Sequence, residues 1–310
     1  MSRCKWPVDV VIPSYNGREL LSKLIPNLAR VGLADSVIVV DDASTDGSAD
    51  FVRSQFPGIK IIARAHNGGF SAAVNDGIRA TDSEFVLVLN NDVELTEGFL
   101  EPLLTVFADS DVFAVSPRIL LGGWDGVDDG AKSAVWHHGM IYADHLQGIS
   151  EVKSVFFVSG CAALYRRSML NDLRGFDEAY APFYWEDVDL SYRAWKRGWK
   201  SVYQPASRVA HVHSATISSL CRAYVDSIKT RNNLLFLWRN VEDKGLVRQH
   251  RIWLPLVLAK RVFSRDFAFL QGFLLARDKY SEALRFREED SKYRVMSDKE
   301  IFEITGVRTT

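Results

Sequence analysis

The sequence has few cysteines and no long apolar run, and each absence excludes a class of protein. It contains three cysteines in 310 residues, and no two of them are spaced as a CxxC pair. We therefore expect neither a disulfide framework nor a structural zinc site, and a reducing compartment fits this usage. The longest apolar run, residues 252–259, is short and contains Pro255. No single helix is therefore predicted to cross a bilayer.

The chain also lacks an excess of either charge. Its 38 Lys and Arg residues nearly balance 39 Asp and Glu residues, which gives a formal net charge of −1. A global basic field for nucleic acid is therefore absent, and we expect no nucleic-acid partner. The start of the sequence has a charged, valine-rich run instead of the pattern of a signal peptide. Together these features predict a cytoplasmic protein.

The first 116 residues alternate between short β-branched runs and helical patterns. The predicted strands are 8–12, 37–41, 59–63, 84–89 and 112–116. The predicted helices between them cover 20–28, 51–56, 71–79 and 99–107. Near-continuous apolar strands suit a sheet that is covered on both faces. The fold class is therefore predicted to be α/β, with a mainly parallel sheet and helices on both faces.

The rest of the chain divides into an irregular insertion, a second regular stretch and a helical end. Glycines interrupt residues 118–154, where we expect a hairpin or an active-site loop. The regular stretch is predicted to contain strands over 155–165 and 201–204, a helix over 187–197 and extended chain over 209–213. Helices should then dominate up to about residue 287, and the charged last twenty residues are expected to fray. We divide the chain into a catalytic part, 1–218, and a helical C-terminal part, 219–310.

Polar residues follow each of the first four predicted strands. The four stretches are 13–17, 41–47, 66–70 and 90–92. Any one of them could be a helix cap or a turn, but the carboxyl ends of parallel strands are also where ligands bind. All four stretches at one sheet edge indicate a binding site. Neither a GxGxxG motif after the first strand nor a GxxxxGK[ST] motif is present, which disfavours dinucleotide redox chemistry and P-loop hydrolysis.

Several motifs in a fixed order resemble family 2 glycosyltransferases, which have the Rossmann-like GT-A fold. They are residues 10–16, 39–48, 67–70 with Asn75, 90–93, 160–161 and 185–190. The resemblance covers about residues 8–215, roughly two thirds of the chain. The Asn-Asp-Val form at 91–93 and the stretch 229–233 further resemble the bacterial rhamnosyltransferase-like branch.

The resemblance implies a site for a nucleotide diphosphate sugar. It places Asp42 at the base or ribose with Asp41 as a helper, and it places Pro13 and Tyr15 beside the base. A turn at Asn67 and the glycines after it would let backbone amides approach the nucleotide. The residues assigned to the donor are Pro13, Tyr15, Asp41, Asp42, Asn67, Gly69, Asn91 and Asp92.

The pyrophosphate of such a donor calls for a divalent cation, Mg²⁺ or Mn²⁺. By resemblance, Asp92 is the last member of an Asp-x-Asp metal site, and His211 belongs to a closing histidine motif that supplies a further ligand. The first position of the metal site is Asn90, which leaves a single carboxylate. The alternative for His211 and His213 is a pair of ordinary histidines at a sheet edge.

The resemblance also assigns the catalytic acids. Asp187 is the expected base that deprotonates the acceptor hydroxyl in an in-line, inverting attack, and Glu186 is expected to orient the acceptor. Asp189 is expected to be structural, because two positions further on it faces another side of the helix. The alternative is that these acids only cap the helix that begins here.

The predicted function is inverting transfer of a sugar to a saccharide in bacterial surface polysaccharide synthesis. The donor is dTDP-L-rhamnose or a UDP-hexose, and the acceptor is a saccharide or a lipid-linked saccharide. A sugar-phosphate nucleotidyltransferase is one alternative, although the glycine-rich basic loop typical of that class is missing after the first strand. A degenerate binding module is another: Asn90 favours it, and the retention of Asp92, Glu186, Asp187 and His211 opposes it.

One stretch of the C-terminal part is basic and apolar. Residues 229–266 hold nine Lys or Arg residues against three acids, together with many large apolar side chains. Such a segment can lie on an anionic membrane surface, or its apolar residues can pack onto the catalytic part. We therefore predict peripheral contact with the inner face of the plasma membrane through residues 239–265, with packing as the alternative.

Overall fold

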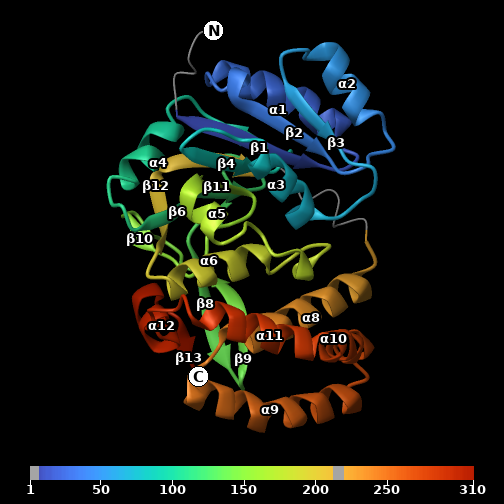
Figure 1. Ribbon diagram of the computed structural model, residues 1–310, viewed down its shortest axis with the longest axis vertical. Helices are drawn as coiled ribbons and strands as arrows, with labels where there is room; N and C mark the ends of the chain where they lie inside the picture. The colour runs from blue at the N-terminus through green and yellow to red at the C-terminus, as the bar shows by residue number, and fades with distance from the viewer. Residues whose placement is uncertain (1–6, 212–219) are drawn as a thin grey trace.

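A computed structural model describes residues 7–211 and 220–310, and its centre is a ten-stranded sheet. The first four parallel strands are β1 (Val8–Ser14), β2 (Val37–Asp41), β3 (Lys60–Ala63) and β4 (Phe85–Leu89). They lie in the order β4-β1-β2-β3, and each matches a predicted strand to within two residues. Their carboxyl ends therefore meet at one edge of the sheet, as the sequence predicted (Figure 1).

The sheet continues past β4 with one antiparallel strand. Strand β11 (Ala162–Arg166) lies between β4 and β6 (Val112–Leu121) and is antiparallel to both. Strand β12 (Lys200–His211) then runs parallel to β6, with an irregularity between Gln204 and Arg208. The two segments predicted at 201–204 and 209–213 thus form one strand, and His213 lies outside the described residues.

The prediction of a strand over 155–165 was wrong in its first half. Residues 155–161 form no strand, although 155–158 are all buried. Val155 and Val158 belong to one hydrophobic cluster, whereas Phe156 and Phe157 belong to another. The run is apolar because it lies between two cores, so its composition imitates that of a buried strand.

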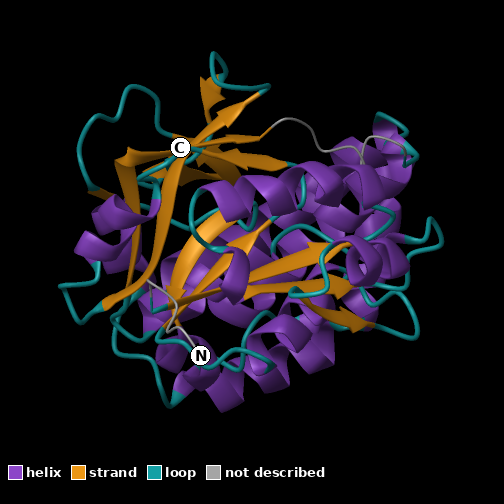
Figure 2. Ribbon diagram, turned by 90° about the horizontal axis from the view of Figure 1, so that it is seen from above, coloured by secondary structure: helices purple, strands orange, loops and turns teal. Residues whose placement is uncertain are grey.

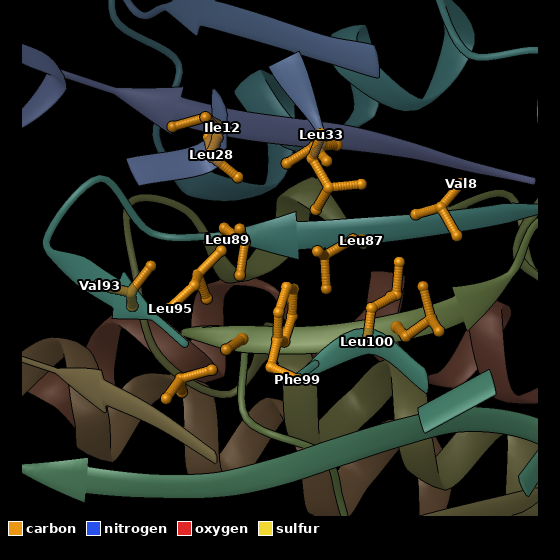
Figure 3. Close-up of a cluster of buried hydrophobic side chains, with 14 of the residues drawn as sticks. Val8, Ile12, Leu28, Leu33, Leu87, Leu89, Val93, Leu95, Phe99 and Leu100 are labelled. Atoms are coloured by element: carbon orange, nitrogen blue, oxygen red, sulfur yellow. The ribbon is translucent and has the colours of Figure 1, made fainter. Parts of the chain in front are cut away.

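Helices cover both faces of the sheet, as Figure 2 shows. They are α1 (Arg18–Arg30), α2 (Ser48–Gln55), α3 (Phe70–Arg79), α4 (Leu100–Val106), α5 (Arg167–Asp172) and α6 (Glu186–Lys196). Side chains of β4 alternate between the two faces: Leu87 and Leu89 pack with α1 and α4 (Figure 3), while Val86 and Val88 pack on the side of α3 and α6. The α/β class with helices on both faces is therefore confirmed.

The predicted hairpin in the insertion is present. Strands β8 (Lys132–His137) and β9 (Met140–His145) pair antiparallel, and β13 (Arg308–Thr309) joins β8 to complete a second, three-stranded sheet. Three short strands extend the main sheet: β5 (Val93–Leu95), β7 (Val127–Asp128) and β10 (Lys153–Ser154). Because β13 pairs with β8, the C-terminal end of the chain lies beside the insertion.

The C-terminal part is mainly helical, as predicted. Its helices are α8 (Arg222–Asn240), α9 (Lys244–Phe263), α10 (Phe267–Asp278), α11 (Tyr280–Ser291) and α12 (Asp298–Thr305). Phe236 and Ile301 share a hydrophobic cluster with Trp136, Tyr192 and Trp195 of the catalytic part. The two predicted parts therefore share a core. In the described ranges, no helix is long and apolar enough to cross a membrane.

The expectation that the last twenty residues fray was wrong. Helix α12 begins with a capping box between Ser297 and Glu300. The Asp298 carboxylate is fully buried, where it lies 2.6 Å from Lys196 Nζ and accepts a hydrogen bond from the Tyr192 hydroxyl. Two further hydrogen bonds, each 2.6 Å long, come from the backbone amides of residues 242 and 243. Some of the charged side chains in this segment, such as Asp298, are therefore buried, which composition alone could not show.

We predict that Asp298→Ala lowers the free energy of unfolding by about 3–5 kcal/mol, because it leaves the buried Lys196, among the described residues, with only the more distant Glu242 carboxylate at 3.6 Å. Urea unfolding at neutral pH measures this change. The matched control is Asp226→Ala, which removes an exposed ion pair with Arg222 and should cost less than about 1 kcal/mol. Equal costs in the two variants would contradict the structural role of Asp298.

Candidate functional site

The loops after the first two strands are tied together by hydrogen bonds. The backbone amide of Asp42 donates to the Ser14 carbonyl, and the Asn16 amide donates to the Ser44 hydroxyl. The Asn16 side chain in turn accepts from the Thr45 amide. The loops are therefore mutually fixed. Asn16 supports this arrangement with a backbone φ of 51°, a left-handed conformation that asparagine tolerates well.

Asp42 shapes the loop after the third strand. Its carboxylate accepts hydrogen bonds from the amides of Gly68 (3.0 Å) and Gly69 (2.9 Å), and from Arg64 Nη1 at 2.6 Å. Sequence reasoning assigned Asp42 to the donor and missed Arg64, whose importance appears only when the sheet brings the two residues together. Asp41 accepts from the Ser44 amide through Oδ2, and its buried Oδ1 has no hydrogen-bond partner among residues that the structure describes.

The other residues predicted for the donor lie around this edge. Tyr15 has an exposed fraction of 38% and follows Pro13, which is half-buried in β1. Asn67 is exposed, and its side chain accepts from the Gly69 amide. Asn91 Nδ2 donates to the Ser14 hydroxyl at 2.9 Å, which joins the ends of β1 and β4. Thus the structure brings the ends of all four strands into one connected set of loops.

Gly69 is required where this edge meets the loop at 181–185. Its φ is 81°, and an added Cβ would lie 2.8 Å from the Pro182 carbonyl oxygen. The Phe70 amide donates to that same oxygen. Any side chain at Gly69 would therefore push the two loops apart.

The two predicted metal ligands face each other. Asp92 Oδ1 and His211 Nε2 lie 3.1 Å apart, and both side chains are largely buried. Neither atom has a well-directed hydrogen bond with any residue between 7 and 211 or beyond 220. Burial disfavours the cationic imidazole, but Asp92 and the Cys161 thiol outweigh this effect and raise the pKa of His211 to about 10.

This pair fits a divalent cation. A carboxylate oxygen and an imidazole nitrogen are both suitable ligands, provided that the cation displaces the proton of His211, and neither buried atom has another well-directed hydrogen bond among the described residues. Within the described ranges, no group of three or more His, Cys, Asp or Glu side chains could hold a metal ion. The remaining ligands of a bound cation would therefore come from water and donor phosphates, which is common for Mg²⁺.

Burial raises the pKa of both acids at the start of α6, but their other contacts differ. Burial raises the pKa of Glu186 well above its usual range, and the neighbouring Asp187 charge adds to the effect. Burial also raises the pKa of Asp187, although the amides of Gly160 and Val188 donate to its carboxylate and partly oppose this. Burial therefore favours the protonated form of Glu186 strongly, and the raised pKa makes the half-buried Asp187 carboxylate a better proton acceptor than an ordinary aspartate.

Two neighbouring residues connect this acid pair to the metal pair. The Gly160 amide donates to Asp187 Oδ2 at 3.0 Å, while the thiol of the next residue, Cys161, lies beside His211. The Cys161 carbonyl accepts from the Asn90 amide, two residues before Asp92. One dipeptide therefore fixes the expected base and the expected metal ligands relative to each other.

The loop before Asp187 is held from the C-terminal part of the chain. Tyr184 and Trp185 have φ values of 69° and 78°, which are strained for non-glycine residues. The buried Asn232 of α8 directs its side-chain nitrogen at the carbonyls of Tyr180 (2.8 Å), Phe183 (3.0 Å) and Tyr184 (2.7 Å). Arg231 donates to the Tyr180 and Ala181 carbonyls. Sequence reasoning noted residues 229–233 only as a motif and assigned them no role.

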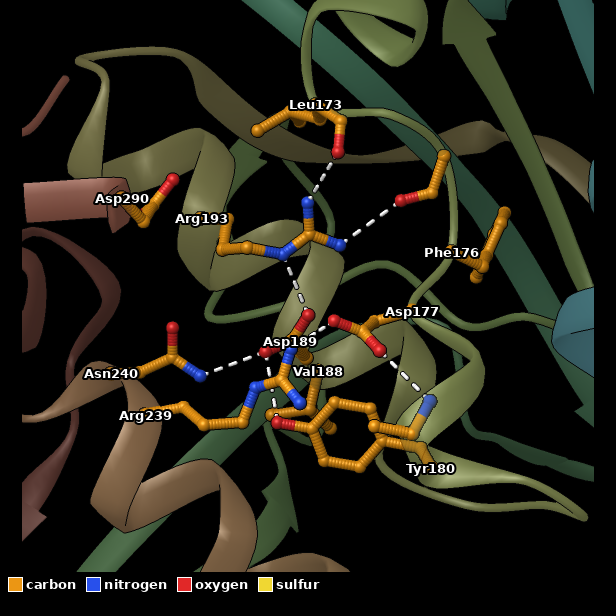
Figure 4. A network of polar contacts seen from close by, with 12 residues as sticks. Leu173, Phe176, Asp177, Tyr180, Val188, Asp189, Arg193, Arg239, Asn240 and Asp290 are labelled. Atoms are coloured by element: carbon orange, nitrogen blue, oxygen red, sulfur yellow. Dashed lines mark hydrogen bonds and ion pairs between the residues drawn. The ribbon is translucent and has the colours of Figure 1, made fainter. Parts of the chain in front are cut away.

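Asp189 has the structural position that the sequence predicted, as Figure 4 shows. Its buried carboxylate accepts from the Tyr180 hydroxyl, Arg193 Nε and Asn240 Nδ2, at 2.9, 2.6 and 2.8 Å. Burial would raise its pKa, but Arg193 and Arg239 outweigh burial and lower it. This network joins α6 to α8 and to Tyr180, the residue just before the loop at 181–185.

Comparison with known proteins identifies the family of this site. The sequence profile of Glycosyl transferase family 2 matches residues 9–174. A pre-mycofactocin glycosyltransferase from Mycobacterium tuberculosis is 35% identical over 66% of this chain, which spans 43% of that protein. An N-acetylglucosaminyl-diphospho-decaprenol L-rhamnosyltransferase from the same species is 30% identical over 57% of this chain and 66% of its own length.

The fold also matches a solved structure. GalNAc-T7, crystallised with UDP, GalNAc and Mn²⁺, aligns with 96% of this chain and 56% of its own, at a TM-score of 0.69 and 17% identity. At this identity the likeness concerns the fold, which is that of GT-A glycosyltransferases.

We predict that Glu186→Gln raises the melting temperature at pH 8 and not at pH 4. In the unfolded chain Glu186 ionises near its usual pKa of 4.5, whereas the folded protein keeps it protonated to higher pH. The stability gained by burying the neutral group is therefore complete below 4.5 and is lost as the pH rises toward the folded pKa. Glutamine never ionises, so the variant escapes this loss.

Thermal unfolding of both proteins between pH 4 and pH 8 measures the difference. The exposed Glu97→Gln variant is the control and should follow the wild type at every pH. A constant offset between Glu186→Gln and wild type across this range would contradict the buried neutral carboxyl.

Proposed function

The chain belongs to glycosyl transferase family 2, and on that premise we propose that it is an inverting enzyme that moves a sugar from a nucleotide diphosphate sugar to a saccharide hydroxyl. The observation that carries the proposal is the dipeptide Gly160-Cys161, which holds a carboxylate of raised pKa next to a buried Asp–His pair. A general base beside a cation site is what displacement of a nucleoside diphosphate needs.

Asp187 acts as the base in this proposal. The acceptor oxygen forms a bond to the anomeric carbon while the bond from that carbon to the diphosphate breaks, and Asp187 takes the hydroxyl proton. The Gly160 and Val188 amides orient the carboxylate. Glu186, kept neutral by burial, orients the acceptor side of the site.

Asp92 and His211 would hold Mg²⁺ or Mn²⁺. When bound, the cation neutralises the charge that develops on the leaving diphosphate. The Mn²⁺ in the GalNAc-T7 complex supports a divalent ion in this fold. Asn90 stands where a second carboxylate would be expected, so we propose that donor phosphates and water complete the ligand set.

The donor occupies the edge formed by the first four strands. Pro13 and Tyr15 lie beside the nucleotide base, and Asp41 Oδ1, which has no hydrogen-bond partner among the described residues, supplies a buried acceptor for the nucleoside. Asp42 acts mainly by holding the Asn67–Gly69 turn in place. We propose dTDP-L-rhamnose or a UDP-hexose as the donor, because one relative is an L-rhamnosyltransferase and the GalNAc-T7 structure contains UDP.

The acceptor is a saccharide, and we propose that it is lipid-linked and serves bacterial surface polysaccharide synthesis. One relative is named as an N-acetylglucosaminyl-diphospho-decaprenol L-rhamnosyltransferase, and the lipid-linked saccharide in that name supports this class of acceptor. In this division of labour, residues 1–218 bind the donor and carry the base, and residues 219–310 lie on the acceptor side. The enzyme would then work from the cytoplasm at the inner face of the plasma membrane.

Helix α9 and the turn after it have a surface suited to such membrane contact. The side chains of Phe263 and Phe267 have exposed fractions of 89% and 72%, and Ile252 and Leu256 are more than half exposed. Only Leu246 and His250 of α9 are buried, and Figure 1 shows this helix at the outer end of the molecule. Packing onto the catalytic part therefore leaves much of the apolar surface of α9 uncovered.

We predict that Asp187→Asn lowers the rate of sugar transfer by roughly 10²–10⁴-fold, because asparagine keeps the shape but accepts no proton. Its affinity for nucleoside diphosphate, measured by calorimetry, should stay close to that of wild type. Transfer is followed by the mass gain of saccharide acceptors with a panel of sugar nucleotides. Undiminished transfer would remove Asp187 from the base role, and release of pyrophosphate would indicate a nucleotidyltransferase instead.

We predict that Asp92→Ala abolishes most of the increase in nucleotide affinity that Mn²⁺ or Mg²⁺ produces, and that His211→Ala reduces it less. Calorimetric titrations with and without the cation measure this increase. Affinity without metal should change little in either variant. If both variants respond to metal as wild type does, the two-ligand site is wrong; if only His211→Ala is silent, His211 is an ordinary edge histidine.

We predict that the protein sediments with anionic liposomes at low salt, and less at high salt, since basic residues near such a surface each contribute about 1 kcal/mol. The Phe263→Ser/Phe267→Ser double variant should sediment several-fold less. Neutral vesicles serve as the control. Equal sedimentation with neutral and anionic vesicles would contradict the membrane proposal.

A further inference from the structure

A cavity of about 380 Å³ lies between the C-terminal helices, apart from the donor residues. It opens among α8, α9, α10 and α11, and none of the residues assigned to donor, base or metal lines it. Leu237, Leu254, Phe273 and Leu284 give it apolar walls, one from each of the four helices. The proposed transfer reaction does not use this cavity.

The cavity is also strongly cationic. Three guanidinium groups, those of Arg251, Arg277 and Arg287, line it, and no Asp or Glu is among its lining residues in the described chain. Arg251 and Arg277 are exposed at the rim, and the recorded ion pair of Arg277 is with the surface residue Asp278. Apolar walls under a ring of arginines form an amphipathic site.

Arg287 is the most informative of the three. Burial lowers its pKa, its Nη2 donates to the Leu237 carbonyl, and its buried Nε has no hydrogen-bond partner among the described residues. In the same residues it forms no ion pair with a carboxylate within 4.0 Å. Glu242 and Asp298 act on Arg287 only from beyond that distance, so its desolvation is incompletely compensated and a bound anion would relieve part of the cost.

His250 does not supply the positive charge. Trp238 Nε1 donates to His250 Nε2, and the other ring nitrogen, Nδ1, lies 2.7 Å from the Gly139 carbonyl. These two contacts specify the neutral tautomer with its proton on Nδ1. Burial lowers the pKa of His250, and the charges of Arg287 and Arg251 lower it further. The cationic character of the cavity therefore comes from the arginines.

We propose that this cavity binds a phosphate carrying a single apolar chain, with the head at the three arginines and the chain along the leucine and phenylalanine walls. Guanidinium forks match phosphate oxygens, and the walls match a prenyl or alkyl chain. The uncovered apolar surface of α9 beside the cavity is consistent with a ligand that arrives from a lipid phase. This site goes beyond the proposed transfer reaction and is separate from the donor site.

Geranyl phosphate is a suitable soluble probe, and Trp136 and Trp238 in the cavity wall report its binding through their fluorescence. We expect saturable binding to the full-length protein. Inorganic phosphate and geraniol, which carry only the head or only the chain, should each bind at least tenfold more weakly. If either binds as tightly as geranyl phosphate, the amphipathic assignment is wrong.

The Arg251→Gln/Arg277→Gln variant removes two of the three cations proposed to hold the phosphate, so it should bind geranyl phosphate at least tenfold more weakly. Both residues lie at the exposed rim, so the substitutions should leave the fold intact. The matched control is Arg248→Gln/Arg265→Gln, which removes two exposed charges outside the cavity and should bind within twofold of wild type. Leu254→Gln should weaken binding of geranyl phosphate while leaving that of phosphate unchanged. Equal losses in the two double variants would overturn the proposal in favour of general surface charge.

Calorimetry with nucleoside diphosphate separates this proposal from the proposed function. The rim variant should bind the nucleotide as wild type does, because none of its changes touches the donor edge. Geranyl phosphate binding is likewise expected in Asp187→Asn. Failure of one site therefore leaves the other testable, and loss of both in the rim variant would contradict a separate site.

Discussion

The contact between Asn232 and the loop before α6 is the constraint on which the catalytic geometry depends. One buried amide is directed at three carbonyl groups of a loop that contains two strained residues. That loop ends at Asp187 and also touches Gly69 of the donor edge through Pro182. A helix from the C-terminal part therefore fixes the loop that precedes the proposed base, and the same loop touches the edge proposed to bind the donor.

Three acids within four positions on α6 have different pKa shifts because their surroundings differ. Burial and the neighbouring Asp187 raise the pKa of Glu186, whereas nearby arginines outweigh burial and lower that of Asp189. Asp187 lies between these extremes, held by two amides and partly exposed. Such separation of pKa values within one site is what different roles for neighbouring acids would require, and it supports the proposed assignment of Asp187 as the base.

Short-range patterns in the sequence correctly predicted the strands and loops whose formation depends on residues close together in the chain. The β-branched runs of β1, β2 and β4 and the polar residues after them were sufficient for the sheet and for the edge where the loops meet. The segment 155–161 was mistaken for strand because burial between two cores selects the same apolar residues. The order at Asp298 was missed because the residue pairs with Lys196, about a hundred positions earlier in the chain.

The predicted site shows the same limit. Motifs indicated Asp187, Asp92 and His211 as candidates, but the hydrogen bond from the Gly160 amide to the proposed base depends on contacts between distant segments. Asn232 lies 45 residues after Asp187, and no periodicity links them. Asp42 similarly acquires its loop-holding role only through Arg64 and the glycines that follow. The sequence indicated which residues to consider, whereas the role of each one could be argued only from the contacts that the fold creates.

In the mechanism that we propose, a single base, Asp187, drives a direct in-line displacement at the anomeric carbon. The anomeric configuration of the product tests it most directly, by proton NMR of the purified saccharide after a single transfer from a donor of known configuration. The account predicts a product whose configuration is opposite to that of the donor. A product that retains the donor's configuration would contradict it.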